Sequence, residues 1–182
     1  HGARVLRQIE PGYANALRQG LAASTGDYVL TLDAYMSHGP DFIAGLLGAR
    51  HGADLVIASR YVAGGGAVMP RHRWLLSLAL NRVYGAALGL EVRDLSSGFR
   101  LYRRRALEAL APRGRHFDVL PEIAAGLVHR GGRVVEVPFV YRPREAGVSK
   151  ARVLKFSPAY TRTLARCVRG RLSAGRRPHS PA

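Results

Sequence analysis

Hydrophobic residues along the chain follow two different spacings. Some short runs are almost continuously apolar, and "YVLTLD" at 28–33 and "ADLVIASR" at 53–60 are the clearest. Runs of this kind are typical of strands in a sheet that is covered on both faces. In other segments, such as "GYANALRQGLAAS" at 12–24, apolar residues recur every three or four positions, which indicates an amphipathic helix. The alternation of the two patterns predicts an α/β fold.

The same patterns give each element an expected range, and the expected sheet is mostly parallel and flanked by helices. We expect strands at 3–8, 28–33, 53–60, 96–104 and 133–144. We expect helices at 12–24, 41–52, 74–90, 104–110, 119–131 and 157–172. Pro138 places the last strand at an edge or a bulge, because proline cannot donate a ladder hydrogen bond. Ser157 and Pro158 predict the N-cap and first turn of the last helix.

The length of 182 residues suits one domain. We expect a globular part at 1–150, a basic amphipathic helix at 151–172 and a disordered tail at 173–182. The single Cys167 excludes an internal disulfide. No run reaches the roughly 18 uninterrupted apolar residues of a transmembrane helix. The most apolar helix, at 74–90, is interrupted by Asn81 and Arg82 and is expected to be buried or interfacial.

The charge of the chain is strongly positive, at +16 from 28 Lys and Arg against 12 Asp and Glu. This excess favours polyanionic partners: phosphorylated ligands, an anionic membrane surface or nucleic acid. Nucleic acid is the least favoured of these, because no aromatic residues are interleaved with the basic ones and no DNA-binding motif is present. In the last expected helix, Tyr160, Leu164 and Val168 form an apolar stripe. That helix is expected to lie on an anionic membrane or to pack on its own domain.

Four loops that concentrate charge or glycine, at 33–38, 60–73, 94–100 and 144–150, are each expected to follow a strand. In a parallel sheet such loops meet at one edge. The charged residues that we expect there are Asp33, Arg60, Arg73, Asp94, Arg144 and Lys150. Two carboxylates among several cations describe a phosphate-handling site.

Purely structural roles are the alternative for each of these residues. Asp33 would then cap the following helix, Asp94 would pair with Arg93 or Arg100, and the arginines would be solvated surface side chains.

Six segments in order resemble family two glycosyltransferases, most closely the dolichol-phosphate or polyprenol-phosphate mannosyltransferase type. They include R-Y-x-x-G-G from Arg60, D-x-S-S-G-F-R from Asp94 and G-x-S-K from Gly147. The resemblance implies a GT-A fold with a Rossmann-like sheet. It also implies a nucleotide-sugar donor, with GDP-mannose favoured and a UDP-sugar as the alternative. The sugar would pass with inversion to a polyprenyl or dolichyl phosphate at the cytoplasmic face of a membrane.

The resemblance also implies roles for individual residues. Asp33 is similar to the first carboxylate of the D-x-D motif, which serves the donor diphosphate and Mg²⁺ or Mn²⁺. Asp94 is similar to the acidic residue that orients the acceptor or acts as a base. The residues similar to the group that holds the phosphates are Arg60, Arg73, Arg144, Ser149 and Lys150.

Two departures from the family pattern bear on activity. The family's first strands, which bind the base and ribose, have no counterpart before His1, so we expect the catalytic domain to be partial. Tyr35 stands at the second D-x-D position, and a phenol is a poor ligand for Mg²⁺. The alternative function is therefore a catalytically impaired glycosyltransferase-like domain that binds anions or membranes.

Overall fold

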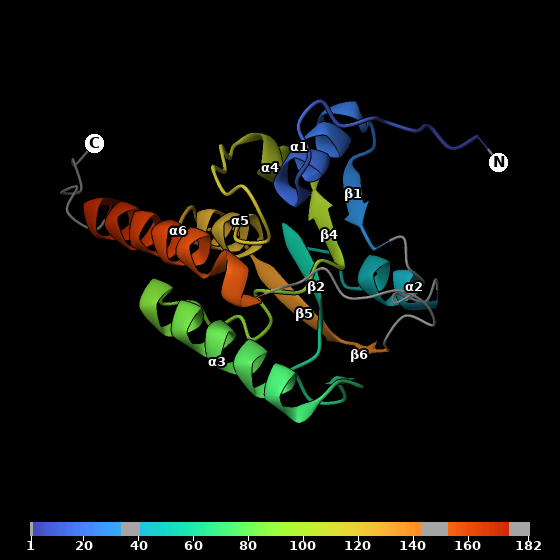
Figure 1. Cartoon of the computed structure of the whole chain (residues 1–182). Helices are drawn as coiled ribbons and strands as arrows, with labels where there is room; N and C mark the ends of the chain where they lie inside the picture. Colours follow the sequence, from blue (N-terminus) through green and yellow to red (C-terminus); the bar gives the residue numbers. More distant parts are fainter. Residues whose placement is uncertain (1, 34–40, 143–152, 175–182) are drawn as a thin grey trace, which may run out of the picture.

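The computed structural model describes residues 2–33, 41–142 and 153–174 (Figure 1). The helices are α1 Tyr13–Ala23, α2 Asp41–Gly48, α3 Arg71–Leu88, α4 Arg104–Glu108, α5 Val119–Val128 and α6 Val153–Ala174. The strands are β1 Tyr28–Thr31, β2 Leu55–Ser59, β3 Gly66–Ala67, β4 Arg100–Arg103, β5 Val134–Pro138 and β6 Val140–Tyr141. None of the described helices is long and apolar enough to cross a membrane.

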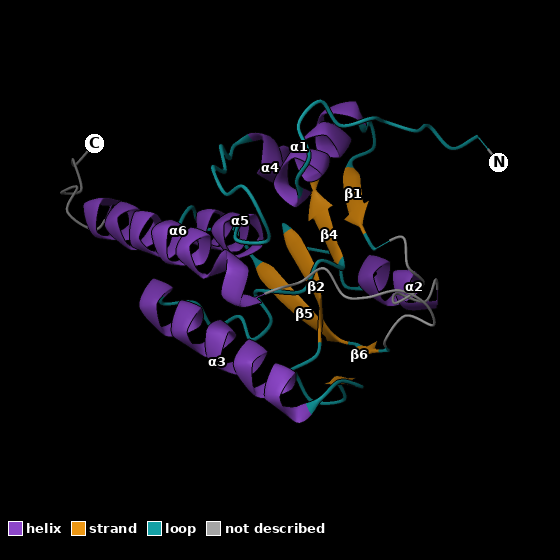
Figure 2. Ribbon diagram, viewed as in Figure 1, coloured by secondary structure: helices purple, strands orange, loops and turns teal. Residues whose placement is uncertain are grey.

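The main sheet is mixed, with strand order β1-β4-β2-β5 (Figure 2). β2 and β5 pair in parallel, whereas β4 runs antiparallel to both β1 and β2. Three of the four strands therefore point the same way, but only one of the three pairings is parallel. The α/β prediction is confirmed, and the expectation of a mostly parallel sheet is corrected by β4, which lies between two strands of opposite direction.

Both faces of this sheet are covered, which explains the continuous apolar run of β2. Leu55 and Ile57 face a core cluster built with α1, α3, α5 and α6. Val56 and Ala58 face a second cluster that includes Leu46 of α2. Alternate residues of a strand point to opposite faces, so a strand between two cores must be apolar at every position. The burial predicted for 53–60 is confirmed.

One expected strand is absent from the structure, and the last helix begins earlier than expected. Residues 3–8 form no strand: no described strand pairs with them, and the nearby side chains of Val5 and Ile9 are 85% and 91% exposed. Helix α6 begins at Val153, so Pro158 lies inside the helix rather than in its first turn. A proline inside a helix removes one backbone hydrogen-bond donor. Pro138 fits its prediction, because it ends the edge strand β5.

Helix α6 packs on its own domain, beside α3 and α5 (Figure 1). Tyr160 is buried, and Leu164 and Val168 pack against the same core cluster. The Thr163 hydroxyl donates to the buried Asp118 carboxylate at 2.7 Å. Of the two positions expected for the apolar stripe, a membrane surface and the protein's own core, the structure shows the core. The expected domain boundary at residue 150 falls outside the described residues. Of the expected tail at 173–182, residues 173 and 174 belong to α6 instead, and the rest lies outside the described residues.

Candidate functional site

Three strand ends and one loop meet at one edge of the sheet. β1, β2 and β5 share a direction, so Asp33, which is half-buried after β1, and Arg60 after β2 lie at this edge. The prediction that Asp94 follows a strand is wrong, because its loop precedes β4. Since β4 runs antiparallel, its beginning lies at the same edge. The Thr31 hydroxyl of β1 donates to the Gly98 carbonyl of this loop at 2.8 Å.

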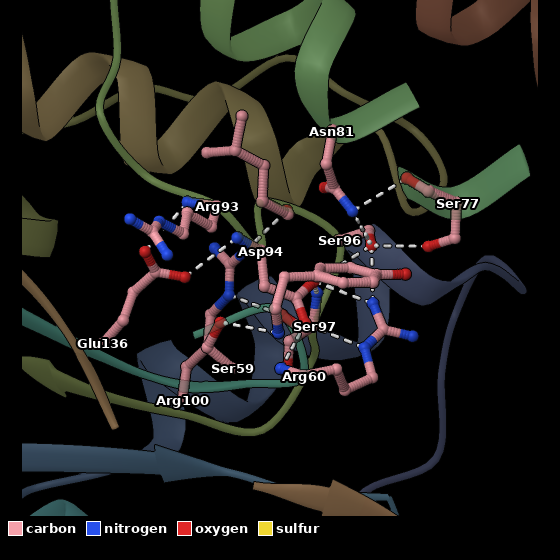
Figure 3. Close-up of polar contacts among 12 residues, drawn as sticks. Ser59, Arg60, Ser77, Asn81, Arg93, Asp94, Ser96, Ser97, Arg100 and Glu136 are labelled. Carbon is pink, nitrogen blue, oxygen red and sulfur yellow. Dashed lines mark hydrogen bonds and ion pairs between the residues drawn. The ribbon is translucent and has the colours of Figure 1, made fainter. Parts of the chain in front are cut away.

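Arg60 and Asp94 form a close two-pronged ion pair at this edge (Figure 3). Arg60 Nε donates to Asp94 Oδ2 and Arg60 Nη2 donates to Oδ1, each at 2.7 Å. The Asp94 carboxylate also accepts from the Arg60 backbone N–H at 3.0 Å, the Ser97 N–H at 3.0 Å and the Ser96 hydroxyl at 3.2 Å. Asp94 is 0% exposed and the Arg60 side chain 13%. The carboxylate therefore fixes the position of one guanidinium.

Ser96 joins this ion pair to helix α3. Its Oγ accepts from Arg60 Nη2 at 2.8 Å and from the buried Asn81 Nδ2 at 3.2 Å. Asn81 also donates to the Ser77 carbonyl at 2.9 Å, and the two serine hydroxyls lie 3.5 Å apart. Figure 3 shows Ser77, Asn81 and Ser96 side by side above Arg60. The second and third turns of α3 are thereby held next to the ion pair.

Glu136 supports the same loop from strand β5. Its Oε1 accepts from the Asp94 N–H and its Oε2 from the Arg93 N–H, both at 2.8 Å. One carboxylate thus binds two successive backbone amides (Figure 3). This contact ties the start of the Asp94 loop to the sheet.

Arg100 holds the other side of the loop from inside the core. It is 0% exposed, and its guanidinium donates to three backbone carbonyls. These are Ser97 O at 2.6 Å, Leu95 O at 2.6 Å and Leu120 O at 2.9 Å. The D-x-S-S-G-F-R motif therefore contains both the carboxylate that faces Arg60 and the arginine that fixes the intervening backbone.

The charges of the pair stabilise one another despite burial. Burial alone would raise the pKa of Asp94, but the hydrogen bonds and charge of Arg60 outweigh it and hold that pKa below its ordinary value. Burial alone would lower the pKa of Arg60, and the bonds to Asp94 outweigh this and raise it. Both groups are therefore ionised at neutral pH, and Asp94 is a weak base.

Two glycines of the motifs lie in close contact with other atoms, and for Gly65 the contact is with backbone. A Cβ at Gly65 would lie 2.5 Å from the Ser59 carbonyl oxygen and 3.0 Å from the Arg60 carbonyl carbon. A Cβ at Gly98 would lie 3.0 Å from the Tyr13 hydroxyl oxygen. The R-Y-x-x-G-G loop can therefore fold back on Arg60 only with glycine at position 65.

The other predicted site residues are placed less closely together. Arg73 is exposed in the first turn of α3, next to Trp74, whose ring meets the Tyr61 ring edge-on at 6.2 Å between centroids. The described residues contain no group of three or more His, Cys, Asp and Glu that would hold a metal. The predicted residues that lie outside the described part of the chain are Tyr35, Arg144, Ser149 and Lys150.

Sequence reasoning missed the partners that build this site. It offered Arg93 and Arg100 as structural partners of Asp94, whereas the ion pair is to Arg60. It also missed Glu136 and Asn81. Each carries a signal in the sequence, since Glu136 is a lone charge in "VVEV" and Asn81 a lone amide in "LALN". An isolated polar residue in an apolar element needs a buried partner.

Comparison with known proteins places the chain in a family. Residues 1–111 match the family Glycosyl transferase family 2. The polyprenol monophosphomannose synthase of Mycolicibacterium smegmatis is 34% identical, over 91% of this chain and 62% of that protein. The dolichol-phosphate mannosyltransferase of Pyrococcus furiosus is 33% identical, over 80% of this chain and 42% of that protein.

A likeness in fold accompanies these sequence matches. The crystal structure of glucosyl-3-phosphoglycerate synthase from Mycobacterium tuberculosis with Mn²⁺, UDP-glucose and phosphoglyceric acid superposes with a TM-score of 0.64 at 23% identity. The match covers 92% of this chain and 56% of that one. This chain thus spans between 42% and 62% of the length of these proteins. It has a GT-A fold and belongs to glycosyl transferase family 2.

Proposed function

We propose that this domain serves the transfer of a sugar, mannose in the favoured case, from a nucleotide-sugar to a polyprenyl or dolichyl phosphate. The observation that carries the proposal is the Arg60 guanidinium fixed by buried Asp94 at the edge of the sheet. Relatives named as mannosyltransferases of polyprenol and dolichol phosphate support it. A guanidinium held in this way keeps one nitrogen, Nη1, for a charge-assisted hydrogen bond to a phosphate oxygen.

The chemistry asks for positioning and charge neutralisation more than for a base. A phosphate monoester is already ionised at pH 7, so its oxygen attacks the anomeric carbon without losing a proton. The bond from that carbon to the donor phosphate oxygen breaks, and the nucleoside diphosphate leaves with the electron pair. One displacement of this kind inverts the configuration. Holding the two reactants in line supplies most of the acceleration.

Arg60 and Asp94 have separate roles in this proposal. Within the described part of the chain, Arg60 uses Nε and Nη2 for its bonds to Asp94 and Ser96. Its Nη1 is therefore the atom that meets a phosphate oxygen. Asp94 is a positioning residue, because it is buried and accepts five hydrogen bonds. Arg73, Arg144, Ser149 and Lys150 complete the phosphate contacts.

A divalent cation is part of the proposal in a limited way. Mn²⁺ and UDP-glucose are named in the structure of the mycobacterial synthase. In the described part of this chain no group of three or more His, Cys, Asp and Glu is present, so a metal would be held by few protein ligands. We keep Asp33 with the donor phosphates as the proposed ligands for Mg²⁺ or Mn²⁺. No step of the mechanism above passes through the metal.

Donor titration tests the proposal. We expect calorimetry to detect GDP-mannose binding that depends on Mn²⁺, and we expect Tyr35→Asp to strengthen it by about tenfold, because a second carboxylate joins the metal. UDP-glucose, titrated in parallel, decides between the two donor classes. If neither the unchanged protein nor Tyr35→Asp binds a donor, and both still bind vesicles, the result would instead support a catalytically impaired domain that binds anions or membranes.

We place the domain at the cytoplasmic face of an anionic membrane, and the exposed face of α3 supports the membrane contact. Leu75, Leu76 and Val83 are 57%, 43% and 56% exposed and share one side of the helix. The exposed cations on the same helix are Arg71, Arg73 and Arg82. Apolar side chains flanked by arginines are typical of helices that lie in a membrane interface. The same helix begins at the proposed phosphate site, so a membrane-held acceptor would reach it.

Vesicle sedimentation tests this membrane surface. The double change Leu75→Glu and Leu76→Glu is expected to lower partitioning onto phosphatidylglycerol-containing vesicles by about tenfold or more, because each leucine gains roughly 1.5 kcal/mol or more on leaving water. Leu47→Glu is the matched control, since Leu47 is 39% exposed on α2. An equal loss in the control would contradict the assignment to α3.

A further inference from the structure

A pocket of about 460 Å³ lies between α5, α6 and the segment that follows α4. Its floor is apolar and includes Leu110, Ile123 and Cys167. Burial, together with the nearby Glu122 carboxylate, raises the pKa of the Cys167 thiol to about 11, so the thiol is uncharged at neutral pH. The pocket shares no residue with the Arg60 and Asp94 network. Figure 1 shows its two main helices side by side.

The rim of this pocket carries an excess of positive charge. Arg113, Arg130, Arg166 and Arg171 line it together with one carboxylate, Glu122. Four positive charges and one negative charge leave an excess of three. Both carboxylate oxygens of Glu122 already accept hydrogen bonds, and among these arginines only Arg166 forms an ion pair with it. A small anion would supply the missing charge.

Existing contacts hold the rim in place. Glu122 Oε1 accepts from Arg166 Nη2 at 2.8 Å, and Oε2 accepts from the Gly114 N–H at 2.6 Å and the Arg113 N–H at 3.0 Å. Arg166 Nη2 also donates to the Thr163 hydroxyl at 3.1 Å. Arg130 Nη1 donates to the Gly126 carbonyl at 3.2 Å. Part of the entropic cost of ordering these side chains is therefore met before any ligand arrives.

We propose that this pocket binds an anionic phospholipid, with the phosphate group at the arginine rim and the first acyl carbons on the apolar floor. Its volume is that of a small-molecule site rather than a groove for nucleic acid. Guanidinium groups bind phosphate through paired hydrogen bonds. The floor distinguishes the lipid from free phosphate, because inorganic phosphate has no apolar surface to bury there. The site is separate from sugar transfer and does not depend on that proposal.

Short-chain lipids provide the test, because they stay in solution as monomers. We expect calorimetry to show dihexanoyl phosphatidic acid binding about tenfold or more tightly than inorganic phosphate or dihexanoyl phosphatidylcholine at equal ionic strength. Phosphate tests the headgroup alone, and the choline lipid tests the chains without net charge. Equal binding of phosphate and the phosphatidic acid would overturn the proposal.

Two kinds of variant assign the binding to this pocket. Gly170→Phe fills the pocket without changing its charge, and Gly20→Phe on α1 is its control, because a Cβ at either glycine meets no atom within 4 Å. We expect Gly170→Phe to weaken phosphatidic acid binding about tenfold and Gly20→Phe to leave it unchanged. Arg130→Gln should weaken it as well, whereas Arg105→Gln, exposed on α4 outside the pocket, should not. No effect of Gly170→Phe, or equal losses in both arginine variants, would overturn the proposal.

Discussion

Asp94→Asn is expected to lower the free energy of unfolding by about 3–5 kcal/mol at pH 7, which is the usual cost of breaking a buried ion pair. The change removes the only charge that is bonded to Arg60 among the described residues, and the Arg60 side chain is 13% exposed. Urea unfolding followed by circular dichroism measures the loss. For a domain of this length, each kcal/mol corresponds to roughly 2–4 °C in melting temperature.

The pH dependence of this loss follows from the direction of the shift. Because the folded state holds the pKa of Asp94 below its ordinary value, the ionised carboxylate stabilises the fold above an unfolded pKa of about 3.9. That contribution is lost as the pH falls through the lower folded pKa. The difference between wild type and Asp94→Asn should therefore be full at pH 7 and shrink in acid below about pH 4.

A double-mutant cycle separates the pair from its surroundings. Arg60→Gln together with Asp94→Asn should cost less than the sum of the single changes, because neither charge is left alone. Additive costs, or a loss below about 1 kcal/mol in Asp94→Asn, would show that the two side chains act independently.

Arg100→Met is expected to cost about 3–5 kcal/mol, because it removes three buried hydrogen bonds to carbonyl oxygens, each at roughly 1–3 kcal/mol. These oxygens belong to Leu95, Ser97 and Leu120. The loss should also loosen the loop that carries Asp94, so amide hydrogen exchange at 94–98 should speed up together with the fall in melting temperature.

Arg104→Met is the matched control for this change. Arg104 donates to the Gly26 carbonyl at 2.6 Å and to the Ser24 hydroxyl at 2.7 Å, but its side chain is 22% exposed. Water can therefore replace the lost donor, and the expected cost is about 1 kcal/mol. If Arg100→Met cost no more than Arg104→Met, the buried guanidinium would not be what holds the loop.

Much of the fold was predictable from local pattern. Helix α1 and strand β2 match their expected ranges closely, because the spacing of apolar residues reports directly on which faces are buried. The failures have a common cause. Residues 3–8 have the composition of a strand, yet a strand forms only where a neighbour supplies hydrogen bonds, and local composition does not report on neighbours.

At the candidate site, too, the local sequence predicts some features and distant contacts decide the others. The motif from Asp94 to Arg100 identifies the family and both buried charged residues. The partner of Asp94 is 34 residues away, and the support from Glu136 is 42 residues away. Those contacts exist because β4 lies between β1 and β2 and β5 lies beside β2.

By itself, the sequence determined the α/β pattern, the family and two of the charged residues at the site, Arg60 and Asp94. The tertiary structure alone decided that β4 runs antiparallel, that Arg60 pairs with Asp94 and that α6 packs on the core. It also decided that four arginines surround one apolar pocket. The physical reason is that the spacing of apolar residues along the chain indicates which side chains are buried. The partner of a charged residue depends instead on the order of the strands and on the packing of helices that are distant in the chain.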